Sequence, residues 1–169
     1  MVCRRFEMGE LILTTTAILA VITAGALVGI DQLLKVWAAN ALAGGAIALI
    51  PGVLSLTYHE NFGAAFGILQ NQQFFLVGIT SLVMLCGVVL LFSGWVKSML
   101  LMWSIALVLG GGVGNLIDRV WRGYVVDYVY FEPINFPIFN FADSCVVVGT
   151  GLIMLYILFF EGKAKPGIR

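Results

Sequence analysis

Long apolar segments separated by more polar ones dominate the sequence. Four of them are long enough to cross a bilayer, because a spanning helix needs about 20 apolar residues. They cover residues 11–30, 74–92, 98–117 and 142–160, and charged or turn-forming residues mark their ends. The pattern predicts an all-α membrane protein with four transmembrane helices, forming a single integral membrane domain over residues 1–169.

The segment after the first span has a different periodicity. Residues 53–58 place Leu54, Leu56 and Tyr58 on one face of an extended chain, as in a half-buried strand. Pro51-Gly52 is a turn signal, and residues 46–50 can supply a partner strand. We expect a small extracytoplasmic β-sheet at the membrane surface, whose apolar face meets lipid or the helix tips.

The composition supports a membrane protein. Hydrophobic residues make up 61% of the chain, charged residues only 11%, and the mean hydropathy is +1.04. A soluble domain of this size could not cover so much apolar surface. The net charge is zero, which implies no basic surface for nucleic acid, and the odd number of cysteines argues against a disulfide framework.

The positions of the cations predict the orientation. Cytoplasmic segments carry an excess of Lys and Arg. One set comprises Arg4, Arg5, Lys97, Lys163, Lys165 and Arg169, and a smaller set on the opposite side comprises Lys35, Arg119 and Arg122. This predicts cytoplasmic termini, with residues 31–71 and 118–141 outside. The first span is too long for the apolar region of a cleaved signal peptide, so it is interpreted as a retained anchor.

A glycine run lies inside the third span. It lacks the lysine and hydroxyl residue of a phosphate-binding loop. Gly110 and Gly114 have the spacing that lets membrane helices approach closely, as do Gly25 and Gly29. Helix packing is the predicted role of all four.

Polar residues suited to chemistry collect on the predicted outer side. They are Asp31, Lys35, Asn61, Asn115, Asp118, Arg119, Asp127, Asn140 and Asp143. A charge beside long apolar runs is costly and points to function. Convergence of polar groups from separated segments is typical of a site.

Asp127 and Asp143 are the main candidates for chemistry. Asp143 follows Asn140 by three residues, so on its own it would be read as a helix-capping residue. Asp127 follows two valines and needs a partner, and the intervening segment is long enough to bring the two carboxyls together. In such a pair one carboxyl keeps its proton while the other is a base. The pair can then activate water and protonate the departing nitrogen of a peptide bond.

The remaining polar residues allow two interpretations each. Asp31 and Lys35 form an intrahelical ion pair, or hold a loop or neighbouring helix beside the site. Arg119 reaches the headgroups, or joins Asn115 in holding a carboxylate or a substrate carbonyl. His59 is the only histidine. A zinc site or a serine–histidine relay would therefore lack parts, and no metal is predicted.

Five ordered motifs resemble those of bacterial lipoprotein signal peptidases, also called signal peptidase II. They are Asp31-Gln-Leu-Leu-Lys35, Asn61-Phe-Gly-Ala-Ala-Phe66, Gly114-Asn-Leu-Ile-Asp-Arg119, Gly123-Tyr-Val-Val-Asp127 and Phe139-Asn-Phe-Ala-Asp143. The resemblance covers nearly the whole chain. Tyr128 and the His59-Glu60 pair depart from the family pattern.

The resemblance implies a membrane aspartic endopeptidase whose catalytic residues are Asp127 and Asp143. Its implied site-lining residues are Asn61, Asn115, Arg119 and Asn140, and its implied structural supports are Asp31 and Lys35. The implied substrate is a prolipoprotein, cut on the amino side of its diacylglyceryl cysteine at the outer face of the bacterial cytoplasmic membrane. Membrane lipids are expected partners, with no cofactor and a monomeric enzyme.

Two other classes compete with this interpretation. A proton-relaying transporter predicts charges near the bilayer midplane and often an internal repeat. Here the charges lie at span ends and no repeat is apparent. A structural scaffold would leave the convergence of polar residues unexplained.

Overall fold

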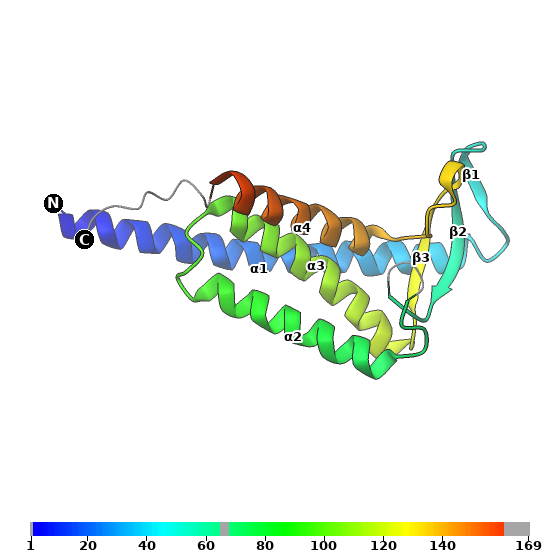
Figure 1. The fold of residues 1–169 in the computed structure, drawn as a ribbon, viewed down its shortest axis with the longest axis horizontal. Coiled ribbons are helices and arrows are strands. Elements are labelled where there is room, and N and C mark those ends of the chain that lie inside the picture. The colour runs from blue at the N-terminus through cyan, green and yellow to red at the C-terminus, as the bar shows by residue number, and fades with distance from the viewer. Residues whose placement is uncertain (1, 65–67, 161–169) are drawn as a thin grey trace.

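Four helices lie side by side, and a small sheet crosses their common end (Figure 1). The computed structural model describes residues 2–64 and 68–160, with side chains from residue 11 onward. The helices are α1 (Val2–Ala41), α2 (Gln73–Phe92), α3 (Met99–Trp121) and α4 (Phe141–Phe160); the strands are β1 (Ile47–Ile50), β2 (Leu54–Asn61) and β3 (Val125–Phe131). A short 3₁₀ turn, Glu132–Ile134, follows β3.

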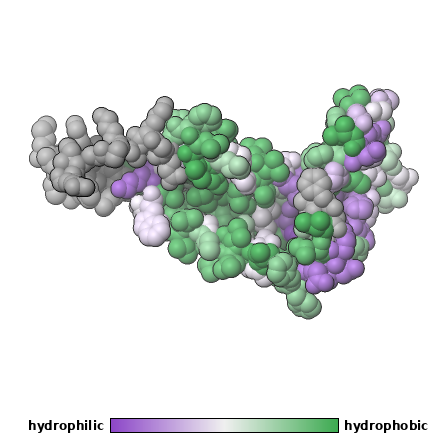
Figure 2. All heavy atoms as spheres, in the orientation of Figure 1, coloured by the Kyte–Doolittle hydropathy of each residue, from purple (hydrophilic) through white to green (hydrophobic). Residues whose placement is uncertain are grey.

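All four helices are long and apolar enough to cross a membrane. Figure 2 shows the apolar surface along the helices and polar residues gathered near the sheet. The predicted four spans are therefore confirmed. The cations at positions 4, 5, 163, 165 and 169, and the last two residues of the Asn61–Phe66 motif, lie outside the described side chains.

Helix α1 extends further than the first predicted span. It continues to Ala41 instead of ending near residue 30. No glycine or proline interrupts residues 31–41. The charges at Asp31 and Lys35 are also compatible with a continuing helix, because their side chains pair at 2.8 Å.

The sheet is antiparallel in the order β1-β2-β3. The β1–β2 hairpin confirms the sequence prediction, and Gly52 in its turn has a φ of +72° that glycine adopts readily. Strand β3 was not predicted. It pairs with β2 so that Asn61 opposes Val125 and His59 opposes Asp127. This pairing places Asp127 in a rigid strand instead of a loop.

The apolar face of the sheet packs on the end of α1. Leu56 and Tyr58 of β2 lie against a buried cluster formed by Ala38, Leu42, Val126 and Tyr128. Of the two expected surroundings for this face, lipid or a helix tip, the structure has the helix tip. The extension of α1 therefore supports the sheet.

The predicted packing role holds for only half of the glycines. A Cβ added at Gly110 would overlap Leu27, and one at Gly114 would overlap Asp31, so these two glycines do allow α3 to approach α1. The prediction for Gly25 and Gly29 is wrong, because no heavy atom outside their own helix lies within 4 Å of an added Cβ. Spacing alone does not reveal which face of a helix meets a neighbour.

Candidate active site

Asp127 and Asp143 line the same cavity, which has a volume of about 820 Å³. Asp127 lies on β3 and is only 1% exposed, whereas Asp143 lies in the first turn of α4. Asn61, Asn115 and Arg119 line the cavity beside them. The fold therefore brings together polar residues that are separated by up to 82 positions in the sequence.

Two asparagines hold the Asp127 carboxyl group. Asn140 Nδ2 donates to its Oδ1 at 2.6 Å, and Asn61 Nδ2 donates to its Oδ2 at 2.9 Å. Burial raises the pKa of Asp127 to about 7, and the nearby Asp143 carboxyl acts in the same direction. The two amide donors oppose this rise without cancelling it. Asp127 therefore holds its proton close to neutral pH.

Asp143 is both a helix-capping residue and a cavity residue. Asn140 Oδ1 accepts from Asp143 N at 2.9 Å, and Asn140 N donates to Asp143 Oδ2 at 3.1 Å. This reciprocal pair is a capping box, and it confirms the predicted N-cap at Asn140. The other oxygen, Oδ1, accepts from Asn115 Nδ2 at 2.8 Å.

A buried lysine orients Asn115. Lys35 Nζ donates to Asn115 Oδ1 at 2.8 Å and pairs with Asp31 at 2.8 Å and Asp118 at 3.1 Å. An ammonium group can only donate, so it fixes the amide oxygen toward Lys35 and leaves the NH₂ for Asp143. The Asp31–Lys35 pair is thus an intrahelical ion pair that also holds a neighbouring helix beside the site.

Asp31 and Asp118 connect this lysine to other elements. Asp31 Oδ1 accepts from Ala142 N at the start of α4 at 3.2 Å. Asp118 Oδ2 accepts from Val126 N at 3.1 Å, immediately before Asp127. Both carboxylates are fully buried. Together they tie α1, α3, β3 and α4 to one buried ammonium group.

Arg119 lies at the cavity with part of its guanidinium unused. Its Nη2 donates to Gly63 O at 3.1 Å, and its charge interacts with the carboxyls of Asp143 and Asp127. Its Nε is buried without a hydrogen-bond partner among the described residues. This geometry favours the role beside the carboxylates over a role at the headgroups.

Sequence reasoning assigned no role to three residues that line or adjoin the site. Gln32 donates to Gly114 O at 3.1 Å, and the hydroxyl of Tyr128 accepts from Phe141 N at 3.3 Å. His59 was not predicted to belong to the site; it is exposed, and it lines the cavity. The two-residue period of β2 puts His59 on the face of Asn61, and this signal could have revealed its position.

No group of three or more His, Cys, Asp or Glu residues in the described part of the chain is placed to hold a metal ion. The site consists instead of two carboxyls with amide, ammonium and guanidinium donors. Its fold and chemistry are those of a polytopic membrane protein of the aspartic peptidase class.

Comparison with known proteins identifies the family. The family described as Signal peptidase (SPase) II matches residues 13–159. The chain belongs to this family of membrane peptidases, as its motifs predicted.

Individual relatives agree with this assignment. A lipoprotein signal peptidase from Streptococcus thermophilus strain CNRZ 1066 is 49% identical over 133 residues, covering 78% of this chain and 87% of that protein. One from Clostridioides difficile strain 630 is 44% identical over 140 residues, covering 82% and 94%. A bacterial membrane enzyme solved by the in meso method at 2.3 Å has a TM-score of 0.81 and 32% identity, covering 89% and 93%.

Proposed function

We propose that this protein removes signal peptides from lipid-modified prolipoproteins, with Asp127 and Asp143 as its catalytic pair. One observation carries the proposal: the two carboxyls, from β3 and α4, line a single cavity among fixed N–H donors. The names of the relatives support the substrate class. The scissile bond is the peptide bond on the amino side of the diacylglyceryl cysteine.

The mechanism divides acid and base between the two carboxyls. Asp127, with a pKa of about 7, holds a proton and donates it during cleavage. Asp143 accepts a proton from the attacking water while Asn115 and Asn140 N–H groups hold its two oxygens.

Arg119 and the apolar walls position the substrate. Buried Nε of Arg119 has no partner among the described residues and is available to a carbonyl of the substrate backbone. Ile79, Val83 and Val147 supply apolar lining beside the carboxyls. A lipid-modified cysteine suits such a site, because its acyl chains stay in apolar surroundings while the peptide reaches the carboxyls.

We further propose that the site faces outward from the bacterial cytoplasmic membrane and that both termini are cytoplasmic. The support is the sequence distribution of Lys and Arg, which are more numerous before the first span, between the second and third spans and after the fourth span than in the other segments. The catalytic unit is a single chain in contact with membrane lipids and requires no cofactor.

The test compares Asp127→Asn and Asp143→Asn with the native protein in detergent, using a lipid-modified precursor. We expect each variant to lose at least about 100-fold in cleavage rate, because each removes an acid or base. Glu132→Gln is the matched control, since Glu132 follows β3 and does not line the cavity. Substantial cleavage by the Asp143→Asn variant would show that Asp143 only caps helix α4 and is not catalytic.

The same precursor without its lipid tests the substrate. We expect its cleavage to be much slower, and equal rates for the two forms would contradict the proposed substrate class. Proton flux through the protein without any proteolysis would favour a transporter instead.

A further inference from the structure

Helix α2 packs on the other helices through a narrow ridge of its own side chains. Its buried side chains are Leu76, Met84 and Leu91, and the rest of its surface is largely exposed. The three follow one another at intervals of about two helical turns, and Met84 and Leu91 pack in one cluster with residues of α3. Apolar space remains on both sides of this ridge.

The space on one side belongs to the cavity that holds the carboxyls. Ile79, Thr80, Val83 and Met84 of α2 line it. The space on the other side is a separate apolar groove of about 360 Å³ between α1 and α2, with Val28 and Val113 in its walls. Among the described residues, only Met84 lines both spaces.

The partition between the two spaces is a side chain that can move. A Cβ added at Gly112 would overlap Cε and Sδ of Met84, so the thioether lies directly on the bare backbone of α3. Methionine is unbranched and adapts to irregular gaps. A backbone partition would be fixed, whereas this one changes shape when one side chain rotates.

Met84 lies close to the chemistry. Gly112 precedes Asn115 by three residues on α3, which is about 4.5 Å along the helix axis, and Asn115 donates to Asp143. A linear ligand that starts at the carboxyls and runs along the cavity, away from the sheet, therefore meets the side chain of Met84 within about one helical turn.

We propose that Met84 is a specificity-determining residue that selects substrates by the length of their acyl chains. This inference rests on the proposed function, because it takes the chain to be part of the diacylglyceryl group. One acyl chain lies along the cavity against Met84, and a longer chain needs the groove between α1 and α2. The thioether limits entry to that groove.

The selection is steric. An acyl chain that leaves the bilayer for an apolar cavity exchanges one apolar surrounding for another, so burial alone gives little gain. A misfit in a packed apolar site is costly, and one oversized group corresponds to at least about a fivefold change. The shape of residue 84 therefore decides which chain is accommodated.

The experiment uses one precursor peptide carrying either two lauroyl or two stearoyl chains, with purified protein in detergent. The readout is the ratio of kcat/KM for the stearoyl form to that for the lauroyl form. We expect Met84→Phe to lower this ratio at least about fivefold, because the ring closes the partition. We expect Met84→Ala to raise it by a similar factor, because the groove becomes open.

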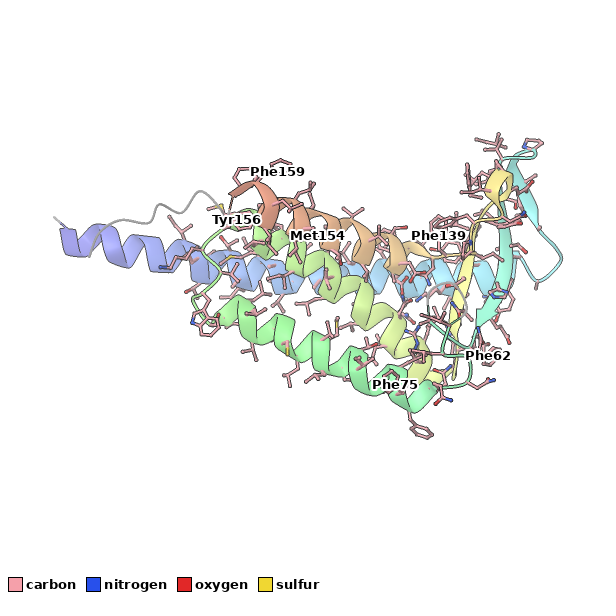
Figure 3. The ribbon with its side chains drawn as sticks, viewed as in Figure 1. Phe62, Phe75, Phe139, Met154, Tyr156 and Phe159 are labelled. Carbon is pink, nitrogen blue, oxygen red and sulfur yellow. The ribbon has the colours of Figure 1, made fainter. Side chains whose placement is uncertain are left out.

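The controls are Met154→Phe and Met154→Ala. Met154 is 58% exposed on α4, in the half of that helix far from the sheet, and lines neither space (Figure 3). The inference is supported if the stearoyl-to-lauroyl ratio of kcat/KM keeps its native value in both Met154 variants, falls in Met84→Phe and rises in Met84→Ala. If Met84→Phe does not fold, a raised ratio in Met84→Ala still supports it, and an unchanged ratio still overturns it.

Two results would overturn the inference while leaving the proposed function intact. One is a stearoyl-to-lauroyl ratio of kcat/KM that stays at its native value in both Met84 variants. The other is a Met84→Phe variant that loses kcat/KM by the same factor for both precursors. Failure of the native protein to cleave either precursor would instead refute the proposed function.

Discussion

Asn115 and Asn140 each present their NH₂ group to a carboxyl of the pair because something else occupies their oxygen. Lys35 donates to the oxygen of Asn115, and the backbone N–H of Asp143 donates to that of Asn140. Neither amide can flip without losing a buried bond. The donors around the carboxyls are therefore fixed before substrate arrives, which is the arrangement that favours electrostatic stabilisation of a transition state.

Lys35→Met tests how much this arrangement depends on the buried ammonium. The substitution leaves the carboxylates of Asp31 and Asp118 buried without their partner, and breaking a buried pair costs about 3–5 kcal/mol. We expect a large loss of stability in thermal unfolding of the detergent-solubilised protein. Lys97→Met is the control, because Lys97 is exposed. Equal unfolding midpoints for the two variants would contradict the prediction.

The pKa of Asp127 predicts how cleavage depends on pH. Its raised pKa, about 7, means that the proton needed for catalysis is present below neutral pH and is lost as the pH rises. We expect kcat/KM to fall tenfold per pH unit above about 7. Initial rates at substrate concentrations well below KM, from about pH 5 to about pH 9, measure this limb. A rate that stays constant up to about pH 9 would show that Asp127 is not the acid.

Much of the site could be predicted at this scale. The N-cap at Asn140 is a local pattern, and the need of Asp127 for a partner follows from its apolar neighbours. The contact between Lys35 and Asn115 could not be predicted, because it depends on how α1 and α3 pack. The role of Asp118, one of the polar residues predicted to collect on the outer side, depends on the same packing, because its carboxylate lies between Lys35 and Val126 of β3.

At the scale of elements, β3 is the part that the sequence pattern did not predict. Its first four residues, 125–128, are all buried, so the strand has no alternation of apolar and polar positions. A fully buried strand reads as a short apolar run and cannot be recognised by its period. The β1–β2 hairpin was predicted because one of its faces is polar and a turn signal precedes β2.

Close packing of α3 and α4 gives a test at this scale. A Cβ at Gly149 would lie 2.7 Å from Ser104 O and 2.9 Å from Leu107 Cβ, so the helices would have to separate. We expect Gly149→Ala to destabilise the protein by about 1–3 kcal/mol, as overpacking does. Thermal unfolding in detergent measures the change.

Gly151→Ala is the matched control for Gly149→Ala. It adds the same methyl group to the same helix, and no heavy atom outside that helix lies within 4 Å of it. We expect its stability to equal or slightly exceed that of the native protein, because alanine favours a helix over glycine. A similar loss in both variants would mean that helix flexibility, and not packing, explains the effect.

At the scale of the whole molecule, the predicted orientation in the membrane can be tested directly. A single cysteine in a cysteine-free background can report it from intact cells. We expect a membrane-impermeant reagent to label Ile134→Cys and not Lys97→Cys, because both positions are exposed and they lie at opposite ends of the helices. The reverse labelling would place the site on the cytoplasmic side.

The length of α1 has a consequence for the membrane itself. Its membrane-spanning part, Leu11–Ala41, has 31 residues and is about 46 Å long, whereas the hydrocarbon core is about 30 Å thick. The same helix carries Lys35, which holds Asn115 beside the carboxyls, and Ala38, which packs against the sheet. The length of this helix therefore fixes the position of the carboxyls and the sheet relative to its other end. A bilayer whose thickness does not match this helix must thicken or thin locally around the protein, at a cost of fractions of a kcal/mol per Å. The height at which a peptide meets the carboxyls is therefore set by the protein, and the lipids adjust to it.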